Sequence, residues 1–160
     1  MFCKGGWLRV DDPKDLRKVE EELTRFFHAD SPDQIEVLPH AAKKTPVAAE
    51  VTSPQLAWLY RVKAIASEML VPRYSPAAVR RAIEQLDSLL QSPSEVRHVP
   101  RILGEAGVRF VIVEPLPAAK IDGGCLWLND MSPVIGLPMR HDRIGVRTSS
   151  DIPVRYCDRG

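Results

Sequence analysis

The chain has 160 residues, of which 44% are hydrophobic and 27% charged, and its formal net charge is +1. That length suits one domain, which buries roughly 70% of the surface of its unfolded chain. The balanced charge gives no indication of a nucleic-acid or membrane partner, and no run of apolar residues is long enough to cross a bilayer.

The cysteines are few and widely spaced: Cys3, Cys125 and Cys157. They form no CxxC pair, so their spacing signals neither a disulfide framework nor a zinc knuckle. The N-terminal stretch "MFCKGGWLRVDD" lacks the apolar segment of a secretory signal peptide. We therefore expect a cytoplasmic protein.

The first expected helix lies in "DDPKDLRKVEEELTRFF", with Asp12 as its N-cap and Pro13 at its first position. Apolar residues recur there at steps of three and four, which predicts one buried stripe. These residues are Leu16, Val19, Leu23, Phe26 and Phe27. The following residues 28–52 carry three prolines and no sustained period, so residues 1–50 are interpreted as an N-terminal helix and an irregular connector.

Two further helices are expected in residues 51–91. Ser53 is the expected cap of the first, and Ser75-Pro76 restart the chain after the break "VPRY". Because the break is short, we expect an antiparallel helical hairpin whose apolar stripes bury each other.

Residues 92–144 read as a helix followed by three strands. "SPSE" (residues 92–95) matches a capping box, and the helical stripe runs to Gly107, although Pro100 kinks the helix or delays its start. "VRFVIVEPL", "DGGCLWLND" and "VIGL" then predict three strands in succession. The strands alternate, so Phe110 and Ile112 are expected on the face opposite to Val111 and Val113.

Four histidines are the candidate metal ligands: His28, His40, His98 and His141. A helical zinc pair has two histidines four residues apart, and none of the four has a histidine at that spacing. A pair such as His98 and His141 stays open as a zinc-binding alternative to ordinary surface histidines. The arginine-rich stretch "RYSPAAVRR" (residues 73–81) is interpreted as a solvated helix face.

Three acidic residues, Glu105, Glu114 and Asp122, flank the first two strands. Catalytic carboxylates have to converge in a cleft, and solvated element ends explain these three better. Gly123-Gly124 is interpreted as a tight turn, since no GxGxxG or GK[ST] motif accompanies it. Cys125 is expected to be a buried, unreactive thiol.

Taken together, "RHVPRILGEAGVRFVIVEPLPAAKIDGGCLWLNDMSPVIGLPMRHDRI" (Arg97 to Ile144) resembles the segment that leads into the active site of ImmA/IrrE-type zinc metallopeptidases. "SPQLAWLYRVKAIASEMLVPRYS" (residues 53–75) resembles the helical region upstream of it in members that also carry an XRE-type helix-turn-helix. The resemblance covers about residues 7 to 144 and rests on a long co-linear match rather than on a short catalytic signature.

The family pattern implies a DNA-binding helix-turn-helix upstream and, after the stretch like "RHDRI", an aromatic-rich segment followed by an H-E-x-x-H helix. That helix would supply two zinc-binding imidazoles and the glutamate that takes a proton from the metal-bound water. In this chain Ile144 is followed by "GVRTSSD". No position matches a catalytic, cofactor-binding or metal-binding residue of the family, so zinc is implied for complete members and no cofactor is expected here.

We therefore expect an α+β fold: an N-terminal helical region, then a small three-stranded sheet as the remnant of a zincin-like domain, then an unrelated polar tail at residues 145–160. Lacking its covering helix, the sheet should expose an apolar patch. The expected protein is a truncated, catalytically inactive homologue of a peptidase linked to transcriptional regulation and stress response. One alternative is a protein-binding module that complements a full-length relative or a separately encoded HExxH fragment. Another is an enzyme with a reassigned site around His98 and His141. Neither DNA nor a membrane is expected to bind this chain alone.

Overall fold

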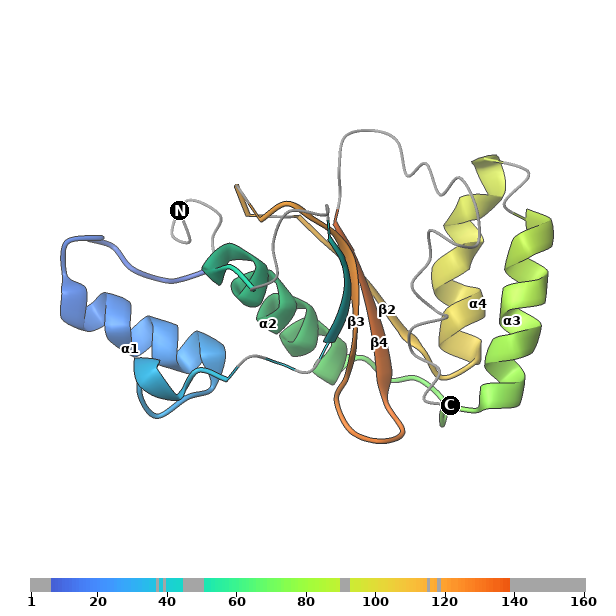
Figure 1. Cartoon of the computed structure of the whole chain (residues 1–160), viewed down its shortest axis with the longest axis horizontal. Helices are drawn as coiled ribbons and strands as arrows, with labels where there is room; N and C mark the ends of the chain where they lie inside the picture. Colours follow the sequence, from blue (N-terminus) through green and yellow to red (C-terminus); the bar gives the residue numbers. More distant parts are fainter. Residues whose placement is uncertain are drawn as a thin grey trace.

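A computed structural model of the chain describes residues 7–36, 38, 40–44, 51–89, 93–114, 116–117 and 119–138. They form an α+β structure in which the strands stand between α2 on one side and α3 with α4 on the other (Figure 1). The helices are α1 (Leu16–Phe27), α2 (Ser53–Glu68), α3 (Pro76–Leu89) and α4 (Val99–Glu105), with 3-10 turns η1 (Pro32–Gln34) and η2 (Pro93–His98). The strands are β1 (His40–Lys44), β2 (Arg109–Val113), β3 (Ile121–Trp127) and β4 (Pro133–Pro138).

The strands form one mixed sheet in the order β1-β3-β4-β2. β3 and β4 are an antiparallel hairpin, β2 runs parallel to β4, and β1 is antiparallel to β3. The α+β class and the three C-terminal strands are as predicted from the sequence. β1 is a fourth strand, and it lies in the stretch that the sequence analysis interprets as an irregular connector. The sequence "HAAKK" has no strand pattern; it is extended because it pairs with the edge of β3.

One face of the sheet packs against α2. Trp58, Leu59 and Val62 of this helix are fully buried against the strands, and the Trp58 indole N–H donates to the backbone oxygen of Val113 at 3.2 Å. Gly136 of β4 makes this close approach possible. A Cβ atom there would lie 2.9 Å from Trp58 Cη2 and 2.9 Å from both methyl groups of Val62.

The opposite face packs against α3 and α4. Leu86 of α3 and Leu103 of α4 share a buried cluster with Phe110, Cys125 and Ile135 of the strands. Phe110 and Val111 thus lie on opposite faces, as predicted, and Cys125 and Leu126 of β3 are divided between the same two faces.

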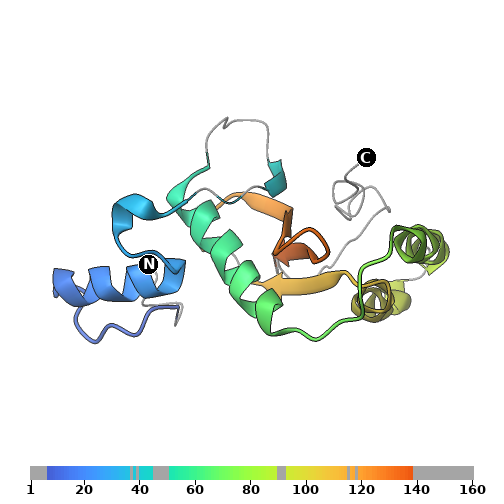
Figure 2. The same cartoon turned by 90° about the horizontal axis from the view of Figure 1, so that it is seen from below.

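The expected mutual burial of the second and third helices is wrong. α2 and α3 belong to different hydrophobic clusters and lie on opposite sides of the sheet, as the view in Figure 2 shows. The segment after α2 runs past the sheet to α3 (Figure 2). Its Tyr74 backbone lies directly against Gly107, where an added Cβ atom would be 2.5 Å from Tyr74 Cα. The antiparallel partner of α3 is therefore α4.

The expectation of an uncovered sheet also needs correction. Helices α2, α3 and α4, which precede β2, β3 and β4 in the sequence, pack against the two faces of the sheet. The polar tail at residues 145–160 lies outside the described residues.

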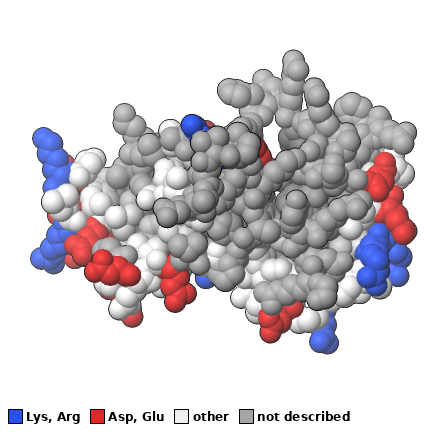
Figure 3. Space-filling view, viewed as in Figure 1, with Lys and Arg blue, Asp and Glu red and all other residues white. Residues whose placement is uncertain are grey.

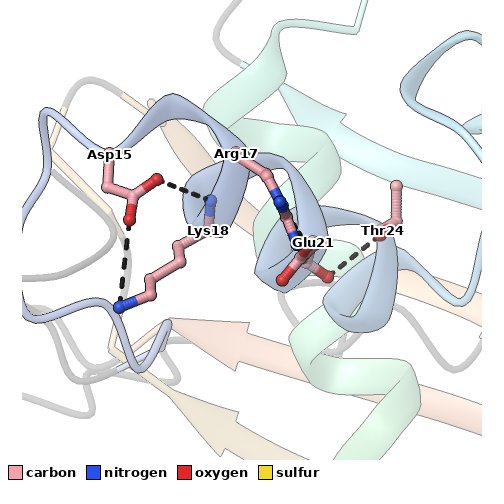
Figure 4. A network of polar contacts seen from close by, with 5 residues as sticks. All are labelled: Asp15, Arg17, Lys18, Glu21 and Thr24. Atoms are coloured by element: carbon pink, nitrogen blue, oxygen red, sulfur yellow. Dashed lines mark hydrogen bonds and ion pairs between the residues drawn. The ribbon is translucent and has the colours of Figure 1, made fainter.

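Two helix starts differ from the sequence prediction, and the start of α4 agrees with the later of its two predicted alternatives. Asp15 rather than Asp12 caps α1: its Oδ1 accepts the Lys18 N–H at 3.2 Å (Figure 4). Thr52 rather than Ser53 caps α2. α4 begins only at Val99, so that Pro100 falls in its first turn, where no N–H is required.

Helix α1 docks on α2 through a chain of aromatic rings. The ring centroids of Phe26 and Phe27 lie 5.0 Å apart and those of Phe27 and Tyr60 4.9 Å apart, both edge to face. The Tyr60 hydroxyl donates to the backbone oxygen of Glu36 at 3.0 Å, which ties the segment after α1 to the same place. Among the helices in the described part of the chain, none is both long and apolar enough to cross a membrane.

Candidate functional site

The histidines do not form a metal site within the described residues. His28 ends α1 in a left-handed conformation with φ of +52°. His98 Nε2 lies 3.2 Å from Arg97 Nε and 3.4 Å from Glu95 Oε2.

The other two histidines have no described side chain. His40 lies in β1, where only the backbone is described, and His141 lies outside the described residues together with the pairing proposed for it with His98. In the described ranges, no three His, Cys, Asp or Glu side chains come close enough together to hold a metal ion.

The acidic candidates lie apart and face solvent. Glu105 is exposed on α4, 3.8 Å from the equally exposed Arg101. Glu114 follows the C-terminal end of β2, and Asp122 is near the N-terminal end of β3. α4 leads into the opposite, N-terminal end of β2, so Glu105 and Glu114 are separated by the length of that strand.

The glycine pair and the cysteine have different roles from those predicted. Gly123 and Gly124 lie within β3 and not in a tight turn, and Gly124 faces Gly136 across the ladder under α2. Cys125 is 1% exposed, as expected for a buried residue, but it is disulfide-bonded and not a free thiol. The other two cysteines, Cys3 and Cys157, lie outside the described residues.

The arginine-rich stretch is a solvated surface, as predicted. Arg73, Arg80 and Arg81 are exposed. Figure 3 shows basic and acidic side chains next to each other at the end of the molecule formed by α3. Such mixed charge does not favour a single class of charged partner.

Apolar residues reach solvent at one corner of the sheet. Ile112 of β2 pairs in register with Leu137 of β4, and Gly123 of β3 continues this row on the face of α3 and α4. Ile112 is 38% exposed, whereas Leu137 is partly buried and packs against the cluster formed with α3 and α4. The corner lies at the C-terminal end of β4.

A hollow of about 300 Å³ lies between the segment before α1, α1 itself and α2. Its aromatic part is Trp7 and Phe26, whose rings stack with centroids 6.1 Å apart and planes at 21°. Its charged part is Arg9, Glu22, Arg25 and Arg61. Sequence reasoning missed this group, because its members are scattered from residue 7 to residue 61 and no spacing rule connects them.

Comparison with known proteins gave no similar protein: no family model, curated protein or solved structure matches the chain.

Proposed function

We propose that this chain is a catalytically inactive relative of the ImmA/IrrE-type zinc metallopeptidases, and that its sheet corresponds to part of a zincin-like domain. The resemblance of residues 97–144 to the segment preceding the family's active site supports the relationship. The observation that carries the loss of activity is in the sequence: its 160 residues contain no H-E-x-x-H. Without that motif, two zinc ligands and the general base of the family's reaction are missing.

The experiment is a zinc and activity measurement on the purified chain beside a complete family member. We expect the complete member to retain stoichiometric zinc after dialysis and to cleave its substrate. We expect this chain to do neither. Stoichiometric zinc that is lost on replacing His98 with alanine would contradict the proposal and support the reassigned site.

A second function is supported by the exposed sheet corner. In the family pattern, the active-site helix follows the strand that corresponds to β4, and Ile112 and Leu137 lie at the end where β4 finishes. Burial of exposed apolar surface is the main driving force for association between proteins. We propose that this corner receives a helix from a full-length relative or from a separately encoded HExxH fragment.

This binding proposal is tested by co-expression with the HExxH fragment of a complete family member. We expect the two chains to co-purify and Ile112→Lys to abolish the complex, since lysine places a charge in the apolar contact. Leu70→Lys is the matched control, because Leu70 is a fully exposed leucine outside the sheet. Equal loss in both variants, or no complex with the unmodified chain, would contradict the proposal.

We also propose a cytoplasmic location, in line with the regulatory peptidases that the sequence resembles. The disulfide at Cys125 opposes this proposal, because disulfides are rare in a reducing cytosol. Thiol titration of the denatured protein, isolated from cells with its thiols blocked at lysis, decides the question. All three cysteines should be blocked in a cytoplasmic protein, whereas a single blocked cysteine would contradict that location.

A further inference from the structure

The hollow between α1 and α2 combines an aromatic surface with positive charge. Trp7 and Phe26 are half-buried, so their rings are held by the protein and still reach the hollow. Stacked aromatic rings bind flat, unsaturated ligands, and every nucleobase offers such a face.

The charged side chains that line the hollow do not neutralise one another. Its three arginines and one glutamate give a formal charge of +2. Glu22 is already engaged, because its carboxylate forms an ion pair with Arg25 and accepts the Arg9 backbone N–H at 3.4 Å. The guanidinium groups of Arg9 and Arg61 have no ion-pair partner among the residues described, which leaves two cations for a ligand.

We propose that this hollow binds a free mononucleotide, with its base against the Trp7–Phe26 pair and its phosphate neutralised by Arg9 and Arg61. Arginine is suited to this role because its planar fork donates two parallel hydrogen bonds to a phosphate. A volume of about 300 Å³ is at the lower end of small-molecule sites and suits a single nucleotide. A continuous strand would require a longer basic groove, whereas the charged lining of this hollow is three arginines and one glutamate.

The test follows the indole N–H signals of the ¹⁵N-labelled protein during titration with adenosine monophosphate in a phosphate-free buffer of low salt. We expect a saturable shift of the Trp7 signal, which Trp7→Phe removes and thereby assigns. The Trp58 signal is an internal reference, because that ring is fully buried and its N–H is bonded to Val113. Adenosine and inorganic phosphate, titrated separately, should each bind at least about tenfold more weakly, since each lacks one half of the interaction.

Charge-matched variants separate the hollow from general electrostatics. Arg61→Gln should weaken binding about tenfold or more, and Arg61→Lys should weaken it less. Arg17→Gln removes the same charge from a highly exposed position on α1, where Arg17 pairs with Glu21, and should leave the affinity unchanged. Thermal midpoints of the three variants establish that each is folded.

Several outcomes would overturn the proposal. They are the absence of a saturable Trp7 shift, equal binding of inorganic phosphate alone, and equal weakening by Arg17→Gln and Arg61→Gln. Binding of a single-stranded oligonucleotide or a phosphotyrosine peptide at least about tenfold tighter than the mononucleotide would reassign the hollow to a macromolecular ligand.

Discussion

Gly136 is the residue that lets α2 lie directly on the sheet. A methyl group there would press on Trp58 and Val62, which are 0% and 1% exposed and have little room to move. Interiors packed at this density transmit such strain to neighbouring side chains. The absence of a side chain at this one position therefore supports the packing of a whole helix.

We expect Gly136→Ala to lower the free energy of unfolding by about 1 to 3 kcal/mol through overpacking. Gly104→Ala is the matched control, because nothing lies within 4 Å of its added Cβ and the residue is in α4. Alanine should stabilise that helix by about 0.5 to 1 kcal/mol. Urea denaturation of both variants tests the difference, and a neutral Gly136→Ala would show that α2 moves away at little cost.

Tyr60 couples stability to alkaline pH. Burial raises the pKa of its phenol above the ordinary value of 10.0, and the charge of Glu36 raises it further, while the hydrogen bond to the Glu36 backbone lowers it. The folded state thus favours the neutral phenol. The resulting stability is complete below the unfolded-state pKa and is lost as the pH rises through the higher folded-state pKa.

Tyr60→Phe should therefore make the protein less sensitive to alkali. At neutral pH we expect a loss of about 1 kcal/mol, from the hydrogen bond to Glu36. Between pH 8 and about 11, the urea midpoint of the unmodified protein should fall more than that of the variant. Parallel losses in the two proteins would mean that other groups account for the whole effect.

At the scale of the elements, helix ends depend on single side chains that sequence rules place only approximately. Asp12 and Asp15 both precede α1, and both accept backbone N–H groups, from Lys14 at 2.9 Å and from Lys18 at 3.2 Å. Only the bond from Lys18 satisfies an N–H of the helix itself, because the chain makes a turn at residues 12–15 before the helix begins.

Asp15→Ala should cost about 1 kcal/mol, the usual loss of an N-cap side chain. Asp12→Ala should cost less, because it removes a contact in an exposed turn outside the helix. Far-ultraviolet circular dichroism during thermal unfolding of the two variants makes the comparison. A larger loss for Asp12→Ala would place the effective start of α1 earlier than in the structure.

At the scale of the whole molecule, the sheet lies between two hydrophobic clusters and contributes side chains to each of them. Leu59 of α2 is buried on one side and Leu103 of α4 on the other, both at 0% exposure. β2, β3 and β4 each contribute residues to both clusters, so loss of these strands exposes both. We infer that the clusters unfold together.

Leu59→Ala and Leu103→Ala should each lower the free energy of unfolding by about 2 to 5 kcal/mol. Because the two residues share no cluster, the double variant should show the sum to within about 0.5 kcal/mol. Fluorescence and circular dichroism should follow one coincident transition in urea. Two separate transitions would contradict cooperative unfolding through the sheet.

The local pattern was sufficient to predict most elements of the fold. Four helices and three strands follow from apolar periodicity and from Gly107, which ends α4 with φ of +85°. The two faces of β2 and β3 follow from alternation, since neighbouring side chains in a strand must point to opposite sides. Helix starts were less certain, because several Ser, Thr and Asp residues compete as caps.

The arrangement of these elements depended on contacts that no local pattern contains. The sequence by itself determined an α+β chain without H-E-x-x-H, because periodicity and motifs are written in neighbouring residues. Only the tertiary structure decided that α2 and α3 lie on opposite faces, that β1 joins the edge of β3, and that Trp7, Arg9 and Arg61 surround one hollow. The physical reason is that a helix stripe is apolar toward any partner, and the area available for burial on the sheet selects which partner it meets.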